Sequence, residues 1–140
     1  MPCLEISMPK TDIRTKKRLA EKLTTSFATV SNFDAEIFGI RFLEYENNSA
    51  SSGGKLCDGS ENSPYLHFVL YCPKITRTTK KKLAESLTSA FIEAVENISW
   101  KPVIHICEHP YDNVVVDGQL LSDAFEECAE RKFYYDLPKD

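Results

Sequence analysis

The stretch Thr15-Lys-Lys-Arg-Leu-Ala-Glu21 recurs almost unchanged as Thr79-Lys-Lys-Lys-Leu-Ala-Glu85, at an offset of 64 residues. The same offset, without a gap, aligns further residues on both sides of this stretch. The pairs are Pro9 with Pro73, Phe27 with Phe91, Ile40 with Ile104, Glu44 with Glu108, Gly54 with Gly118 and Leu56 with Leu120. One constant offset over this length indicates an internal duplication, because chance similarity between two helices would not extend beyond the helices.

Each copy is predicted to form a strand, a helix and a second strand. Alternating apolar residues indicate the strands, and apolar residues at helical spacing indicate the helices. In the first copy these are strand Cys3–Met8, a helix capped by Asp12 with the stripe Leu19, Leu23, Phe27 and Val30, and strand Ile37–Tyr45. In the second copy they are strand Tyr65–Cys72, a helix with the stripe Leu83, Leu87, Phe91, Ala94 and Ile98, and strand Val103–Cys107.

A strand–helix–strand unit of this size pairs its strands in parallel through a right-handed crossover. Two tandem β-α-β repeats therefore predict an α/β (α+β) fold, a four-stranded sheet with two helices on one face. We expect a single domain over residues 1–140, divided into repeat one (2–56), a connector (57–63), repeat two (64–121) and a C-terminal tail (122–140). The other sheet face would leave apolar surface uncovered, which predicts a homo-oligomer.

Three segments outside the main strands and helices also carry predictions. The Ser-, Asn- and Gly-rich segment Asn47–Ser63 is predicted to be a mobile connector. The Asp117-Gly118 pair lies between two apolar runs and predicts a hairpin turn. Ser122–Arg131 is predicted to form a short helix.

Composition excludes several classes of function. The chain has 140 residues, of which 42% are hydrophobic, and a net charge of −4, so a strongly basic nucleic-acid surface is not expected. No apolar run approaches the roughly 18 residues of a membrane helix, and the N-terminus does not resemble a secretory signal. The five cysteines include no C-x-x-C motif, so we expect reduced thiols in a cytoplasmic protein, with neither nucleic acid nor membrane as partner.

Pro2 directly follows the initiator Met1 and immediately precedes the first predicted strand. Removal of Met1 would expose the proline nitrogen as a secondary amine, which can act as a base. Burial or nearby cations would lower the pKa of this amine toward neutrality. Pro2 could then take a proton from one atom of a substrate and return it to another. The alternative is that a Met-Pro start has no functional meaning.

A β-α-β unit that begins at an N-terminal proline, carries Arg41 on its second strand and continues to Gly53-Gly54 resembles the tautomerase superfamily. The resemblance covers about residues 2–120. The superfamily includes 4-oxalocrotonate tautomerase and longer members with two fused units, such as cis-3-chloroacrylic acid dehalogenase, malonate semialdehyde decarboxylase and macrophage migration inhibitory factor. The resemblance implies a homotrimer that acts on a small carboxylate substrate such as a 2-oxo acid or its enol, without cofactor or metal.

The resemblance also implies roles for individual residues. Pro2 takes the place of the catalytic proline, and Arg41 matches an arginine that binds a substrate carboxylate. Lys74 and Arg77 fall where the dehalogenase-like members have two carboxylate-binding basic residues. Lysine at the first of these keeps the charge but loses the bidentate fork of arginine. His105 falls where the dehalogenase-like members have a tyrosine that helps to position water.

Three departures from the family pattern bear on the reaction. Thr11 stands where the short members have an arginine before the first helix. Ala28 and Val116 stand where the dehalogenase-like members have a histidine and a water-activating glutamate. The departures at Ala28 and Val116 count against dehalogenation or hydration, which need an activated water, and so favour keto–enol tautomerisation, which needs only a base and an anion-binding group. The alternatives are a decarboxylase or a dehalogenase/hydratase of the same superfamily, or a non-catalytic oligomeric binding or signalling protein of this fold.

Each candidate residue also has a purely structural interpretation. Arg41 could be paired at a subunit contact, and Lys74 and Arg77 could be solvated. His105, Cys107 and His109 share one face of a straight strand, but same-face residues lie roughly 6.5–7 Å apart, too far to chelate one zinc ion. Cys3 is predicted to point away from Pro2 and to pack in the core, whereas Tyr111, Tyr134 and Tyr135 could line the mouth of a site or simply pack.

Overall fold

The computed structural model describes residues 2–124, which form one four-stranded sheet, two long helices and several short elements. In chain order these are β1 (Cys3–Pro9), α1 (Ile13–Ser31), the 3₁₀ helix η1 (Ala35–Ile37), β2 (Gly39–Tyr45), β3 (Ser51–Ser52), β4 (Lys55–Leu56), β5 (His67–Cys72), α2 (Arg77–Val95), β6 (Val103–Glu108), the 3₁₀ helix η2 (Tyr111–Asn113), β7 (Val115–Val116), β8 (Gln119–Leu120) and α3 (Leu121–Ala124).

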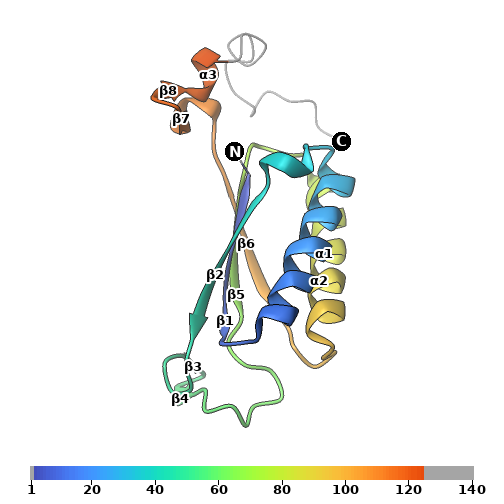
Figure 1. The fold of residues 1–140 in the computed structure, drawn as a ribbon, viewed down its shortest axis with the longest axis vertical. Helices are drawn as coiled ribbons and strands as arrows, with labels where there is room; N and C mark the ends of the chain where they lie inside the picture. Colours follow the sequence, from blue (N-terminus) through green and yellow to red (C-terminus); the bar gives the residue numbers. More distant parts are fainter. Residues whose placement is uncertain (1, 125–140) are drawn as a thin grey trace.

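The sheet has the strand order β2-β1-β5-β6. Within each copy the two strands are parallel, β1 with β2 and β5 with β6, and the copies meet where β1 pairs with β5 in antiparallel orientation. Both long helices lie on the same face of the sheet (Figure 1). The predicted fold class is therefore confirmed.

The two helices begin and end at equivalent positions. Asp12 caps α1 by accepting a hydrogen bond from the Thr15 N–H at 2.7 Å, and Thr76 caps α2 by accepting one from the Thr79 N–H at 3.2 Å. Each helix ends at a residue in the left-handed conformation, Asn32 (φ 61°) or Glu96 (φ 56°). Ile98 therefore lies beyond α2 and is 84% exposed, so its predicted place in the apolar stripe of the helix was wrong.

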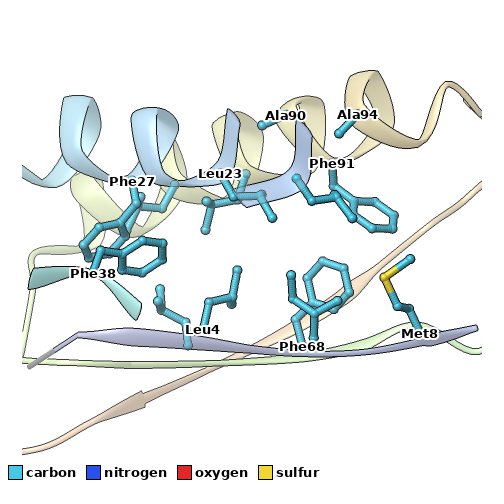
Figure 2. Close-up of a cluster of buried hydrophobic side chains, with 14 of the residues drawn as sticks. Leu4, Met8, Leu23, Phe27, Phe38, Phe68, Ala90, Phe91 and Ala94 are labelled. Atoms are coloured by element: carbon cyan, nitrogen blue, oxygen red, sulfur yellow. The ribbon is translucent and has the colours of Figure 1, made fainter. Parts of the chain in front are cut away.

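One hydrophobic core fills the space between the sheet and the helices. It is made by the alternate residues of β1 and β5 that face the helices and by the apolar stripes of α1 and α2. Figure 2 shows Leu4 and Phe68 pointing from the sheet toward Leu23 and Phe91 on the helices. At one end Phe27 of α1 stacks on Phe38, with ring centroids 4.2 Å apart.

The segment Asn47–Ser63, predicted as a connector, contains a hairpin that was not predicted. β3 and β4 pair as an antiparallel hairpin whose turn is Gly53-Gly54, with φ values of 60° and 80°. The predicted turn at Asp117-Gly118 is confirmed, with β7 and β8 on its two sides. The two hairpins are again 64 residues apart, and the turn of each is made by a pair of residues with positive φ.

Several predicted boundaries change. Residues Ala35–Ile37 form η1, so the second strand begins at Gly39 rather than at Ile37, and β5 begins at His67 rather than at Tyr65. Of the predicted helix Ser122–Arg131, the structure describes only the first part, within α3, and the remainder lies outside the described residues. The division into repeats 2–56 and 64–121 stays a prediction, although the helices, the central strands and the hairpins all recur at the common offset.

The open face of the sheet is less apolar than predicted. Side chains at odd positions point to this face, and they include the charged pair Glu5–Arg41 and the polar pair His67–His105 beside Leu43 and Val103. No helix within residues 2–124 is long and apolar enough to cross a membrane.

Candidate functional site

Pro2 lies at the start of β1 and is buried. Its carbonyl oxygen accepts a hydrogen bond from the Gly39 N–H at 3.3 Å, which fixes the backbone against the start of β2. Because Cys3 pairs with Tyr71 in antiparallel register, Pro2 lies one step further along, beside Cys72 at the end of β5. Pro2, just before β1, and Cys72, the last residue of β5, therefore meet at one end of the sheet.

The segment between β5 and α2 carries two of the predicted site residues to this end. Lys74 is half-buried and follows Pro73, whose side chain is buried, while Arg77 is the exposed first residue of α2. Figure 1 shows the N-terminus and the start of α2 at the same end of the molecule. The positive end of the α2 dipole adds to these two cations, so this end of the sheet favours an anion.

Glu108, the last residue of β6, holds this segment in place. Its carboxylate accepts a hydrogen bond from the Ile75 N–H at 2.9 Å and forms an ion pair with Lys80 of α2 at 2.7 Å. The loop that carries Lys74 and Arg77 is thus tied to both the sheet and the first turn of the helix. The same arrangement, with the Thr11 N–H and Lys16 on Glu44, occurs in the other copy at the opposite end of the sheet.

His109 follows β6 and was not among the site residues predicted from the sequence. Its backbone N–H donates to the carbonyl of Cys72 at 3.0 Å, and its imidazole Nε2 is buried without a hydrogen-bond partner among residues 2–124. Burial and then the positive charge of the N-terminus lower the pKa of His109. The sequence offered one signal for His109, its position at the end of the last predicted strand. That strand, β6, pairs with β5, which ends beside Pro2.

Arg41 does not lie beside Pro2 of its own chain. It projects from the open face of the sheet, where its guanidinium pairs with the Glu5 carboxylate at 2.5 Å and is 71% exposed. Pro2 belongs to the buried alternate positions of β1, on the opposite face. Within one chain, these contacts agree with the structural interpretation of Arg41 as an ion-paired arginine.

His105 also lies on the open face, away from Pro2. Its Nδ1 is 3.0 Å from Nε2 of His67 on the neighbouring strand, and the two rings meet edge to face. His105 is the residue of repeat two that corresponds to Arg41, and both sit in the middle of an edge strand. The structure therefore brings together Pro2, Lys74 and Arg77, and separates them from Arg41 and His105.

The remaining candidates do not add a second centre. Cys3 points to the open face and is half-buried, so its predicted place in the core was wrong. Burial raises the pKa of its thiol. Among residues 2–124 no group of three His, Cys, Asp or Glu side chains is placed to hold a metal ion. Tyr111 is half-buried in η2, while Tyr134 and Tyr135 lie outside the described residues.

Comparison with known proteins identifies the fold. No protein-family model and no curated protein sequence matches the chain. Among solved structures, a native fused 4-OT superposes with a TM-score of 0.76 at 19% identity, covering 86% of this chain and 97% of that one. A fused 4-OT solved as an asymmetric trimer gives 0.75 at 19% identity, covering 87% and 98%. Malonate semialdehyde decarboxylase gives 0.73 at 8% identity, covering 89% and 98%. The chain has the fold of the tautomerase superfamily in its fused, two-repeat form.

Proposed function

We propose that this protein is an enzyme that interconverts keto and enol forms of small 2-oxo acids, with Pro2 as general base and acid. The observation that carries the proposal is the shared position of Pro2, Lys74 and Arg77 at one end of the sheet. A buried N-terminal proline supplies a proton acceptor, and the two cations supply an anion-binding group next to it. In this proposal, residues of a single chain supply both requirements of a tautomerase.

The chemistry needs no net gain or loss of protons. After Met1 is removed, the nitrogen of Pro2 takes the proton from the hydroxyl group on C2 of the enol and returns it to C3. The C2=C3 double bond is replaced by the C2=O bond, so the keto acid is formed. Lys74 and Arg77 bind the carboxylate and stabilise the negative charge that develops on the substrate oxygen. The proposal requires that burial of the amine and the nearby cations lower the pKa of Pro2, so that the nitrogen is unprotonated near neutral pH.

We propose that the protein assembles as a homotrimer, because similar structures are fused 4-OT trimers. Assembly would cover the open face, where Arg41 and His105 lie. If Arg41 binds substrate, it does so in the site of a neighbouring subunit, because it faces away from Pro2 of its own chain. His105, as a substrate-binding residue, would have to act across the same contact.

The first test is the intact mass of the purified protein, because a chain that retains Met1 has no proline amine. The second is the enol-to-keto conversion of phenylpyruvate, followed by ultraviolet absorbance. We expect Pro2→Ala to lower kcat/KM by about 10²–10⁴-fold, the usual contribution of a general base. Pro9→Ala, which alters the last residue of β1 at the end of the strand opposite to Pro2, is the matched control and should retain activity.

Equal rates for the wild type and Pro2→Ala would refute the proline mechanism. Selective alkylation of the N-terminus by a 3-halopropiolate at neutral pH would independently support an amine of lowered pKa. Absence of turnover by a chain that lacks Met1, with phenylpyruvate and with short 2-oxo acids, would refute the tautomerase proposal. Carbon dioxide release from a 3-oxo acid would then indicate a decarboxylase.

A further inference from the structure

A cavity of about 200 Å³ lies between α2 and the last strand of the sheet, β6. Buried leucines of β5 and α2 line one side of it, and the half-buried Ile104 and Ile106 of β6 line another. Ala84 of α2 also lines the cavity and is exposed, so the cavity opens to solvent beside this helix. None of the described residues that line it is charged. The cavity is therefore an apolar site that a molecule can reach from solvent.

Repeat one has the same framework with larger side chains at two places. Five residues that line the cavity have the same residue type 64 positions earlier, and these are Leu83, Ala84, Leu87, Thr88 and Ile104. The two that are smaller than their counterparts are Pro102 and Ile106, which correspond to Phe38 and Phe42. Ile106 and Phe42 occupy the same register positions of β6 and β2. The duplication thus shows what fills this space when it is filled.

Two aromatic rings take up the equivalent space in repeat one. Phe38 is buried and stacks on Phe27 of α1, with ring centroids 4.2 Å apart (Figure 2). Phe42 is half-buried and packs against the same core. Ala20 of α1 is half-buried there, whereas its counterpart Ala84 of α2 is exposed. A framework common to both repeats therefore packs well around aromatic rings, and repeat two has no phenylalanine at either position.

The cavity has the size and the chemistry to bind such a ring. Protein interiors are close-packed, so a molecule that enters an apolar cavity gains contacts on all sides. An apolar cavity of about 150 Å³ in another protein is large enough to hold benzene. Trp100 packs on Phe91 of α2, with ring centroids 6.3 Å apart, and does not line the cavity. Among the described residues, Thr88 supplies the one hydroxyl group of the lining, and a helical threonine can bond it to a carbonyl of the preceding turn.

We propose that this cavity binds a small uncharged molecule that carries a single aromatic ring. The ring lies between α2 and β6, in the place that Phe38 and Phe42 fill in repeat one. A charged group there would lose its hydration without gaining a partner. The inference does not rest on the proposed function, because none of Pro2, Lys74 and Arg77 lines the cavity and binding requires no free proline amine.

The test is a titration of the whole protein with benzene, followed by NMR of ¹³C-labelled leucine and isoleucine methyl groups. We expect the methyl signals of Leu83, Leu87 and Ile106 to shift and to saturate, with a Kd of about 1 mM or lower. The methyl groups of Leu19 and Leu23 in repeat one are the internal control and should not shift. Benzoate, which has the same ring and a negative charge, should leave all these signals in place.

Three variants test the location. Ile106→Phe places in the cavity the ring that repeat one has, and should weaken benzene binding about tenfold or more. Ala84→Leu closes the entrance from the exposed side of α2 and should have a similar effect, so the test does not depend on whether the position of Ile106 accepts a larger side chain. Ile106→Val leaves the cavity open and is the matched control, which should retain binding. Thermal unfolding verifies that each variant is folded.

Three results would overturn the proposal. The first is the absence of saturable shifts at Leu83, Leu87 and Ile106 in the wild type. The second is an unchanged affinity for benzene in both Ile106→Phe and Ala84→Leu, which would place the ring elsewhere. The third is equal binding of benzoate at the same methyl groups, which would show that the site does not select an uncharged ring. None of these measurements requires turnover of phenylpyruvate, so failure of the proposed function would leave them unaffected.

Discussion

Replacing Glu108 by alanine is expected to impair both stability and activity, whereas replacing Glu44 should impair stability alone. The two carboxylates make equivalent contacts, each with a backbone N–H of the loop before a helix and with a lysine of that helix. They hold loops at opposite ends of the sheet, and only the loop held by Glu108 carries Lys74 and Arg77. The internal duplication thus provides a matched control for a site residue.

The expected loss of stability follows from the two contacts. A hydrogen bond to a charged group contributes about 1.5–3 kcal/mol when well protected, and an exposed ion pair about 0–1 kcal/mol. The side chains of Glu108 and Lys80 are 19% and 35% exposed, so the contribution of the ion pair is reduced by solvent. We expect each alanine variant to lose about 2 kcal/mol of unfolding free energy. For a chain of this size that lowers Tm by about 6–8 °C.

The assay combines thermal unfolding at equal protein concentration with phenylpyruvate turnover well below Tm. We expect Glu108→Ala to lower kcat/KM at least tenfold, chiefly through a higher KM, because the released loop no longer presents Lys74 and Arg77 as a fixed pair. Glu44→Ala should keep the wild-type kcat/KM. Equal kcat/KM for the two variants would show that the loop held by Glu108 does not bind substrate, and an unchanged Tm in both would refute the structural role assigned to the carboxylates.

Four further changes test other parts of the structure. The pKa of the Glu44 carboxyl is lowered below its ordinary 4.5, first by the hydrogen bond from Lys16 and then by that from the Thr11 N–H. The contribution of Glu44 to stability is therefore complete above about pH 4.5 and is lost as pH falls through the lowered pKa. The Tm difference between the wild type and Glu44→Gln should accordingly shrink toward zero in acid. Phe27→Ala, at a fully buried ring, should lose about 3–5 kcal/mol in chemical denaturation. Gly118→Val, at φ 78°, should strain the β7–β8 turn and lower Tm by a few degrees, about 1–2 kcal/mol. Ile106→Phe should partly fill a cavity of about 200 Å³ beside α2 and raise stability by about 0.5–1 kcal/mol, and a loss would show that the cavity cannot accept the ring.

The repeat carried most of the fold prediction, because a constant offset constrains both copies at once. The stripe Leu19, Leu23 and Phe27 and the alternation in β1 each fix one buried face, and the structure buries those residues. The hairpin at Gly53-Gly54 was missed because its flanking strands have two residues each, too short for any periodicity. The same offset that aligned Gly54 with Gly118 already contained that information.

The candidate site was predictable only in part, because residues that are close together along a strand can point to opposite faces of the sheet. Lys74 and Arg77 reach the Pro2 end because β5 runs antiparallel to β1 and α2 starts where β5 ends. To place Arg41 and His105, one must know which face of the sheet their side chains point to. This depends on the register of each edge strand. His109 required the end of β6 to be located, which the sequence does not determine to one residue.

The duplication does not give two equivalent sites. At the other end of the sheet, the positions that correspond to Pro2, Arg77 and His109 hold Leu66, Ile13 and Tyr45, so only Lys10 remains as a cation, in an ion pair with Glu46 at 3.7 Å. An internal leucine supplies no amine, and Ile13 supplies no charge. The proposed site instead combines the N-terminus of repeat one with a loop and a strand end of repeat two. Fusion of the two repeats is thus a condition for the proposed site, because it places in one chain a base that only the first repeat can provide and a pair of cations that only the second repeat has.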